Sequence, residues 1–306
     1  MSIILINYDI IYIVGESMSN IFDILDLPKL IIVILLTILP SILILSLILY
    51  SDRKSREPLL MILICIFSGV FTICFSLLID KLILKLNIIN ASMFPSQNSY
   101  SVYRIIVMAG VEEYAKLLIL YLFLYKNNSF DDIYDGFVYS SIIALSFSLI
   151  ETVMYVFREP TFSEMTSLAI LRNFTSIPLH IVCGVVMGYF ISLQKFSKTR
   201  GRKFLNLLLS LFVPTLIHTI YNVFFSIILM DPTSVFTLII VILFILSIYF
   251  IGIMVILKTN RLNMIFINNG YYNKHYRFLM RKSDYIYENL RRSTWYQMHI
   301  IKIYLK

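Results

Sequence analysis

The chain has 306 residues, of which 59% are hydrophobic and only 14% are charged. A soluble globular domain is about 25% charged and 45–50% apolar, so this composition excludes a soluble enzyme, a secreted disulfide scaffold and a disordered chain. Apolar runs of about 18 residues or more recur, each long enough to cross a hydrocarbon core about 30 Å thick. The cysteines lie in apolar segments without metal-ligand spacing, which indicates packing roles for Cys65, Cys74 and Cys183. The sequence predicts a polytopic, all-α membrane protein.

Hydropathy predicts about seven membrane-spanning helices. They cover residues 30–50, 59–79, 101–125, 133–157, 168–193, 204–229 and 235–257. The first 28 residues contain one short apolar stretch, interrupted by Asp9. That stretch is too short to span and follows no basic segment, so we expect it to lie at the membrane surface and not to act as a signal peptide. We predict a single bundle over residues 1–257, with the chemically informative motifs in 101–225.

Positive charge is distributed unevenly between the two sets of connections. Cytoplasmic connections of membrane proteins are enriched in Lys and Arg. With seven spans, one set together with the C-terminal segment carries 19 of these residues, whereas the other set carries only Lys29, Lys81, Lys85 and Arg158. The sequence therefore predicts a multi-pass protein of the cell membrane with its N-terminus outside and its C-terminus in the cytoplasm. The net charge of +8 is explained by this topology, so no nucleic-acid partner is expected.

The C-terminal segment, residues 258–306, carries ten Lys and Arg residues against Asp284 and Glu288, with interleaved tyrosines and Trp295. This pattern is typical of a cytoplasmic anchor with aromatic side chains at the membrane interface. The same segment could bind anionic lipids or a partner protein. We treat it as a basic aromatic tail outside the bundle.

Five of the charged residues inside the predicted spans are singled out, because each charge at the centre of a span costs about 2.5–3.5 kcal/mol on insertion scales. They are Glu112, Glu113, Lys116, Glu151 and Arg172. Without partners they would together cost on the order of 10 kcal/mol, which is comparable to the whole stability of an ordinary domain. Such residues either pair in a polar network that locks the bundle or form a functional site.

Depth in the membrane favours a functional site. Counted from the predicted outer helix ends, Glu112 and Glu113 share a level of about 16–18 Å with His180 and His218 on two other spans. Glu151 and Asn222 lie at about 10 Å, and Asn222 shares a helical face with His218. We take these six residues as the candidate catalytic set.

Lys116 and Arg172 are candidates for supporting roles. Lys116 is three residues after Glu113 and four after Glu112, so either carboxylate could pair with it. We expect Glu112 to form this pair and Glu113 to face the site. Pro178 is expected to bend the fifth span just before His180.

Two chemistries suit these groups, and the residues leave both open. In the first, Glu113, His180 and His218 hold a zinc ion, which activates a water molecule and polarises a peptide carbonyl. In the second there is no metal: Glu112 or Glu113 is the general base on water, helped by His180, while His218 and Asn222 donate hydrogen bonds to the oxyanion. Both hydrolyse a peptide bond within the membrane. The sequence contains no HExxH, GxGD or GxSG motif of other intramembrane proteases.

Four motifs follow one another within residues 101–225. They are EEYAK (112–116), DG followed by Glu (135–151), Arg followed by PLH (172–180) and HTIYN (218–222). This ordered set resembles the PrsW family of intramembrane proteases, which is related to the CAAX-processing and bacteriocin-processing membrane proteases. Thr152 stands where that family's pattern has asparagine. Ser140, Ala144 and Ser146 stand where glycines are expected, although small residues still permit close helix packing.

The resemblance implies an endopeptidase that cleaves membrane-bound protein substrates, of which anti-sigma factors are the best-known class. Two other functions fit buried Glu and His residues. One is a proton- or cation-coupled transporter, and the other is a non-catalytic immunity or scaffold protein of the same fold.

Overall fold

The computed structural model describes residues 25–52, 57–86, 91–230 and 235–268. The described helices are α2 (Leu27–Ser51), α3 (Leu59–Lys85), α4 (Gln97–Ile119), α5 (Ile133–Val156), α6 (Phe162–Phe174), α7 (Ser176–Phe196), α8 (Arg200–Met230) and α9 (Val235–Asn268), with a short 3₁₀ turn at Ala91–Met93 and a π-helical turn at Leu120–Leu124. The described residues contain no strand. The surface segment expected near Asp9 and the tail after residue 268 lie outside the described residues.

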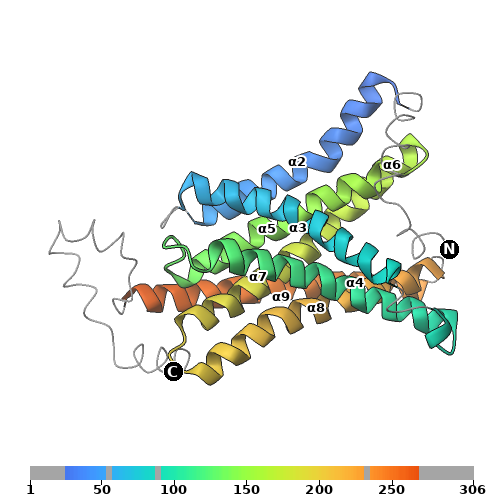
Figure 1. The fold of residues 1–306 in the computed structure, drawn as a ribbon. Coiled ribbons are helices and arrows are strands. Elements are labelled where there is room, and N and C mark those ends of the chain that lie inside the picture. The colour runs from blue at the N-terminus through green and yellow to red at the C-terminus, as the bar shows by residue number, and fades with distance from the viewer. Residues whose placement is uncertain (1–24, 53–56, 87–90, 231–234, 269–306) are drawn as a thin grey trace.

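The predicted all-α membrane bundle is confirmed. Six helical stretches in the described chain are long and apolar enough to cross a membrane. The third predicted span corresponds to α4, which carries Glu112, Glu113 and Lys116 and is therefore more polar. Successive long helices reverse direction, so α2, α4 and α9 end at the same end of the bundle, where α3, α5 and α8 begin (Figure 1). Which end faces the cytoplasm stays a prediction.

The fifth predicted span, residues 168–193, is not one helix. It consists of α6 and α7, which meet at Thr175, whose φ of −123° and ψ of −69° lie outside the helical range. Pro178 has no N–H to donate to the carbonyl oxygen of Phe174 four residues earlier, and that oxygen instead accepts a hydrogen bond from the Tyr249 hydroxyl at 3.1 Å. The break separates Arg172 on α6 from His180 on α7.

Polar residues fix where the central helices begin. The Asp132 carboxylate caps α5 by accepting from the N–H groups of Tyr134 and Asp135, while Asp135 accepts in return from the N–H of Asp132. Ser96 and Ser99 form a similar reciprocal cap on α4. These caps satisfy N–H groups that a helix start leaves unpaired, and so they set the register of the helices that carry the glutamates.

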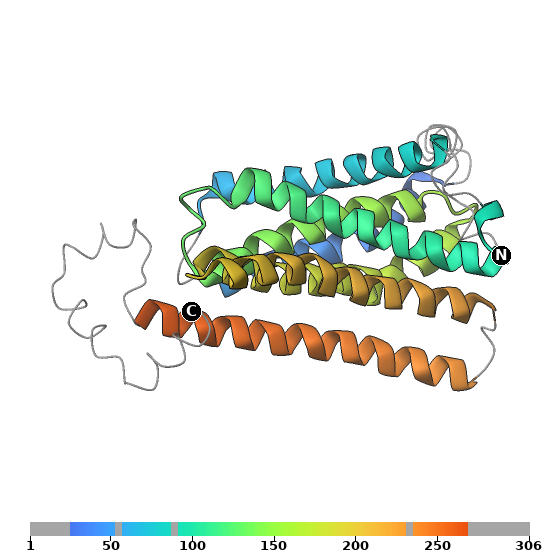
Figure 2. The same ribbon diagram turned by 60° about the horizontal axis from the view of Figure 1, so that its bottom comes forward.

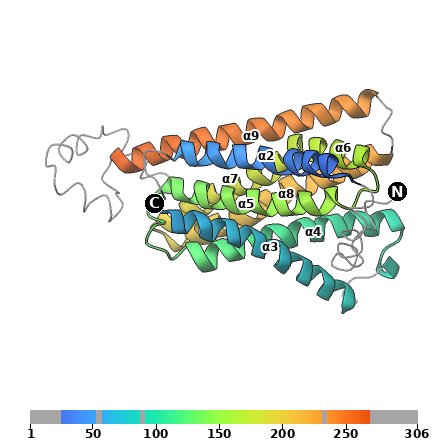
Figure 3. The same ribbon diagram turned by 90° about the horizontal axis from the view of Figure 1, so that it is seen from above.

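Helices α5 and α7 form the centre of the bundle. Residues 133–148 of α5 and nearly all of α7 are buried. Figure 3 shows α3 and α4 along one side of this pair and α9 with α2 along the other. In Figure 2, α9 runs along one edge of the remaining helices. The two central helices are therefore buried all round, whereas α2, α3, α8 and α9 expose large apolar side chains.

Small residues let α5 and α7 approach closely. A Cβ atom added to Gly188 would lie 2.1 Å from the carbonyl oxygen of Gly136, and one added to Gly184 would lie 2.7 Å from that of Ser140. On the other face of α5, a Cβ on Gly69 of α3 would lie 2.5 Å from the Ser146 Cβ. The serines that stand in place of expected glycines thus still permit backbone contact.

We predict that Gly188→Ala destabilises the protein by about 1–3 kcal/mol, because the new methyl group would overlap backbone atoms of α5. Thermal unfolding of the full chain in detergent would measure the loss. Gly201→Ala is the matched control, because a Cβ there would meet no atom within 4 Å in the described chain outside its own helix backbone and its two neighbours in the sequence. Its midpoint should not fall, and equal losses in both variants would contradict the close contact.

Candidate active site

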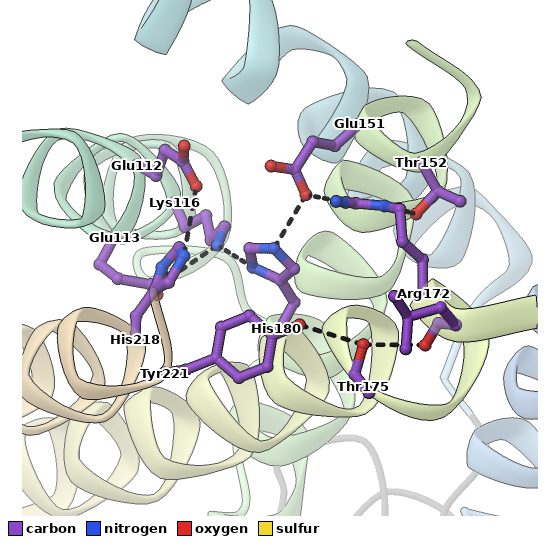
Figure 4. Close-up of polar contacts among 11 residues, drawn as sticks. Glu112, Glu113, Lys116, Glu151, Thr152, Arg172, Thr175, His180, His218 and Tyr221 are labelled. Atoms are coloured by element: carbon purple, nitrogen blue, oxygen red, sulfur yellow. Dashed lines mark hydrogen bonds and ion pairs between the residues drawn. The ribbon is translucent and has the colours of Figure 1, made fainter. Parts of the chain in front are cut away.

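Polar side chains from five helices meet inside the bundle (Figure 4). Glu112, Glu113 and Lys116 come from α4, Glu151 and Thr152 from α5, Arg172 from α6, His180 from α7 and His218 from α8. The carboxylates and imidazoles that the sequence placed at similar depths therefore lie together. The cluster forms because the break at Thr175 and the close contact of α5 with α7 bring these positions to one level.

The deepest part of the cluster is a chain of charged and aromatic groups. The Lys116 ammonium lies 2.7 Å from Glu113 Oε1 and 3.0 Å from His180 Nδ1. Glu113 Oε1 also lies 3.0 Å from His218 Nδ1. The Phe147 ring lies beneath the ammonium, 4.2 Å from its nitrogen. Glu113 is fully buried, and its charge is compensated by the lysine.

This arrangement reverses the expected pairing. Lys116 binds Glu113, three residues earlier, instead of Glu112. The two carboxylates project about 100° apart around the helix, so only one of them can face the lysine. The orientation of α4 against α8 selects Glu113 for the pair, because His218 contacts that same carboxylate. Glu112 is left to face the open part of the cluster.

A second ion pair holds the other side of His180. Glu151 Oε2 accepts from Arg172 Nη2 at 2.5 Å and lies 3.0 Å from His180 Nε2. Arg172 Nε donates to the Thr152 hydroxyl at 3.1 Å, and the guanidinium stacks on the Tyr155 ring at 4.5 Å. Arg172 therefore fixes Glu151, and Glu151 fixes the imidazole.

The partners define the proton positions on the two histidines. An ammonium only donates, so His180 Nδ1 accepts from Lys116 and His180 Nε2 carries the proton that it donates to Glu151. A carboxylate only accepts, so His218 Nδ1 carries the proton that it donates to Glu113. A neutral His218 then presents the lone pair of Nε2 to its remaining neighbour.

That neighbour is Glu112. Its Oε2 atom lies 3.8 Å from His218 Nε2, is buried, and has no hydrogen-bond partner among the described residues. Two acceptors that face each other at this distance repel unless a donor or a cation lies between them. The Glu112 side chain is 13% exposed, against 0% for Glu113, so Glu112 is the carboxylate of α4 that a water molecule can reach.

Ligand atoms of Glu112, His180 and His218 lie within 4.8 Å of one another. This set replaces the expected one, because Glu112 takes the place of Glu113. Carboxylate and imidazole are ligands that zinc prefers, and three protein ligands with an open position are typical of catalytic zinc. The structure thus contains a possible metal-binding group.

Asn222 and Tyr221 lie one turn from His218 on α8. The structure gives the Asn222 side chain no hydrogen bond to the cluster among the described residues, so its expected role on the oxyanion stays a prediction. Tyr221 instead donates to the Thr175 hydroxyl at 3.0 Å and ties α8 to the break between α6 and α7. The sequence reasoning missed both Tyr221 and Thr175, although a tyrosine inside the HTIYN motif was a usable signal.

A further buried ion pair was also missed. Asp80 of α3 accepts from Arg104 of α4 at 2.7 Å, and the Asp80 side chain is buried. The signal was present, since Arg104 lies inside a predicted span and needs a partner. The pair ties α4 to α3 two turns before Glu112, and so it helps to hold the helix that carries the glutamates.

The fold and the cluster together define a polytopic membrane protein with a buried cluster of Glu and His side chains between its helices. The sequence profile of the PrsW family of intramembrane metalloproteases matches residues 57–250, more than half of the chain. The chain belongs to this family and is a protease, which confirms the resemblance seen in the motifs.

Similar proteins include the Protease PrsW of Clostridioides difficile strain 630, which is 32% identical over 189 residues, or 61% of this chain and 76% of the relative. The Protease PrsW of Bacillus subtilis strain 168 is 31% identical over 186 residues, or 60% of this chain and 78% of the relative. The Protease PrsW of Geobacillus kaustophilus strain HTA426 is 27% identical over 183 residues, or 60% and 75% of the two chains. No solved structure gives a significant match.

We predict that Lys116→Met lowers the free energy of unfolding by about 3–5 kcal/mol, because it leaves the Glu113 carboxylate buried without a cation. Adding Glu113→Gln removes that charge and should restore much of the loss. Thermal unfolding of the two variants and the parent in detergent tests this. A double variant no more stable than Lys116→Met would contradict the assigned pair.

Proposed function

We propose that this protease hydrolyses peptide bonds of membrane-bound protein substrates in the plasma membrane, with Glu112 as the general base. The observation that carries the proposal is the unpaired Glu112 oxygen 3.8 Å from His218 Nε2. The resemblance to the PrsW family favours substrates of the anti-sigma-factor type. A tail that binds anionic lipids would keep the enzyme's cytoplasmic end at the membrane surface.

A water molecule between Glu112 and His218 would donate one hydrogen bond to each acceptor, with its oxygen lone pairs free to attack. Glu112 takes a proton as the water oxygen bonds to the peptide carbonyl carbon. The same proton then passes to the leaving amide nitrogen as its bond to carbon breaks. Glu112 suits this task because Glu113 and Glu151 already share their charge with Lys116 and Arg172.

His180 lies beside the position of the attacking water. The imidazole of His180 lies edge-on to that of His218, with ring centroids 4.8 Å apart. Lys116 and Glu151 hold the His180 imidazole from both sides. The positive charge of Lys116 would stabilise negative charge that forms on the carbonyl oxygen. Asn222 remains the candidate for a direct hydrogen bond to this oxygen.

The residues also fit a zinc ion. Glu112 Oε2 has no hydrogen-bond partner in the described chain and lies 3.8 Å from His218 Nε2, while His180 would exchange one of its two partners for the metal. Glu113 would then orient His218 through Nδ1, as carboxylates commonly do behind metal-bound histidines. A bound zinc ion would supply a more acidic water molecule and polarise the carbonyl. Glu112, His180 and His218 are the residues that would hold it.

Transport of protons or cations, and a non-catalytic role, have less support. Membership of a protease family argues against transport. Every ionisable position of the four motifs is present, which argues against an inactive relative.

We expect Glu112→Gln to lower kcat/KM by roughly 10²–10⁴-fold, because an amide cannot accept the proton of the water molecule. Purified full-length protein in lipid nanodiscs, incubated with single-span peptides and followed by mass spectrometry, gives the measurement. Glu113→Gln and His180→Ala should also lose cleavage.

Glu164→Gln is the matched control, because this glutamate is exposed at the start of α6 and lies outside the cluster. It should cleave like the parent. If Glu112→Gln and His180→Ala also cleave like the parent, the assignment of the site is wrong.

For the metal, we expect the purified protein to contain about one zinc ion per chain, and both Glu112→Gln and His218→Ala to lose it while they remain folded. Elemental analysis, with unfolding curves as the folding control, provides the test. Full activity in a zinc-free preparation would mean that Glu112 and the histidines act without metal.

A further inference from the structure

Arg158 has an unusual position at the end of α5. It follows the last turn of that helix, and its backbone N–H donates to the carbonyl oxygen of Tyr155 at 3.2 Å. Its guanidinium stacks on the Tyr155 ring at 5.6 Å, the same ring on which Arg172 stacks at 4.5 Å. Two arginines therefore share one aromatic ring, and one of them is part of the active-site cluster.

The two arginines differ in how their donors are used. Nε and Nη2 form the edge of a guanidinium that binds a carboxylate with two parallel hydrogen bonds. In Arg172 both atoms are occupied, by Thr152 and Glu151. In Arg158 the same two atoms are buried and have no hydrogen-bond partner among the described residues. Buried donors without partners are rare in proteins and indicate a missing ligand.

Among the described residues, no carboxylate forms an ion pair with Arg158, although Glu159 is its neighbour in the sequence. Burial lowers the pKa of this arginine, and the nearby group that opposes the shift is the Tyr155 hydroxyl, not a carboxylate. Glu164, the nearest acid on α6, instead accepts from the Thr161 hydroxyl at 2.6 Å. A cation that is partly removed from water and has no ion-pair partner in the described part of the chain is a candidate binding position for an anion.

We propose that Arg158 binds an acidic side chain of the substrate and so determines which bond is cleaved. Arg158 lies seven residues beyond Glu151, which corresponds to about 10 Å at the rise of a helix, although α5 itself ends at Val156. Glu151 contacts His180, which lies beside the proposed water position. An extended peptide covers about 3.3 Å per residue, so the acidic side chain would lie about three residues from the cleaved bond. The long arginine side chain is only partly buried, and its rotation presents the unoccupied edge to the peptide.

A peptide carboxylate fits this position better than a lipid phosphate. The unpaired atoms are buried instead of facing the surface of the bundle, and they join a continuous stack that ends at Glu151 and His180. A substrate that occupies the cluster would lie beside this stack, because Arg172 contacts both Glu151 and the Tyr155 ring. The inference rests on the proposed protease function and adds a specificity residue to it.

The test uses full-length protein in nanodiscs and one single-span peptide that the parent cleaves. Gln or Glu is placed in turn at each of the four positions on either side of the cleaved bond. The readout is the ratio of kcat/KM for the Glu peptide to that for the Gln peptide. We expect a ratio of roughly ten at one position about three residues from the bond, as for a charge-assisted hydrogen bond that is partly exposed.

The Arg158 variants should change this ratio in a graded way. Arg158→Gln should bring it to about one, and Arg158→Lys, which keeps the charge without the two-donor edge, should leave an intermediate value. Arg158→Glu should favour a peptide with Lys at the same position. Lys85→Gln, which removes an exposed cation at the same end of the bundle, should keep the parent ratio.

Several results would overturn the proposal. One is a ratio in Arg158→Gln equal to that of the parent, and another is a parent ratio of one at every position. Loss of cleavage of all peptides in all three variants would assign Arg158 to the fold. An effect that is equal for both peptides and appears only with anionic phospholipid would assign it to a lipid headgroup. If the parent cleaves no peptide, the proposed protease activity itself fails.

Discussion

A charge placed among hydrocarbon chains needs an opposite charge beside it, and this requirement shapes the interior of the bundle. Three buried ion pairs meet it, namely Asp80–Arg104, Glu113–Lys116 and Glu151–Arg172. Each pair joins two residues of one helix or of two neighbouring helices. Glu112 is the carboxylate in the same region that no Lys or Arg of the described chain contacts. Within the Glu/His cluster, the ion pairs therefore leave Glu112 as the acid without a Lys or Arg partner, next to two histidines, and the proposed chemistry follows from this.

The backbone supplies the precision that this arrangement requires. Gly136, Ser140, Gly184 and Gly188 lie where the backbones of α5 and α7 approach each other closely, and Glu151 and His180 belong to these same two helices. A shift of 1 Å between them would break a 3.0 Å hydrogen bond. The small residues on α5 thus position Glu151 relative to His180, although they do not themselves belong to the Glu/His cluster.

Much of the fold could be predicted from the sequence, because the free energy of placing a helix in the membrane depends directly on its hydropathy and its charged residues. The glutamates, histidines, lysine and arginine of the cluster were identified for the same reason. Pro178 predicted a bend in the fifth span, but hydropathy cannot detect a break between two apolar helices, so the full division at Thr175 was not predicted. The choice between Glu112 and Glu113 depends on a rotation of about 100° around α4, which is set by packing against α8. The sequence of α4 alone does not specify this rotation, because the rotation depends on how α4 packs against α8.

Thr152 shows how a departure from a family pattern can be interpreted once its contacts are known. The resemblance leads us to expect asparagine at this position, and threonine replaces the amide of that side chain with a hydroxyl. In the structure, the Thr152 oxygen accepts from Arg172 Nε, while the adjacent Glu151 accepts from Nη2. An acceptor oxygen is all that this arrangement demands, and a hydroxyl provides it as an amide would. The guanidinium edge is therefore fully occupied in Arg172, and the contrast with the unoccupied edge of Arg158 is a difference in surroundings rather than in side-chain chemistry.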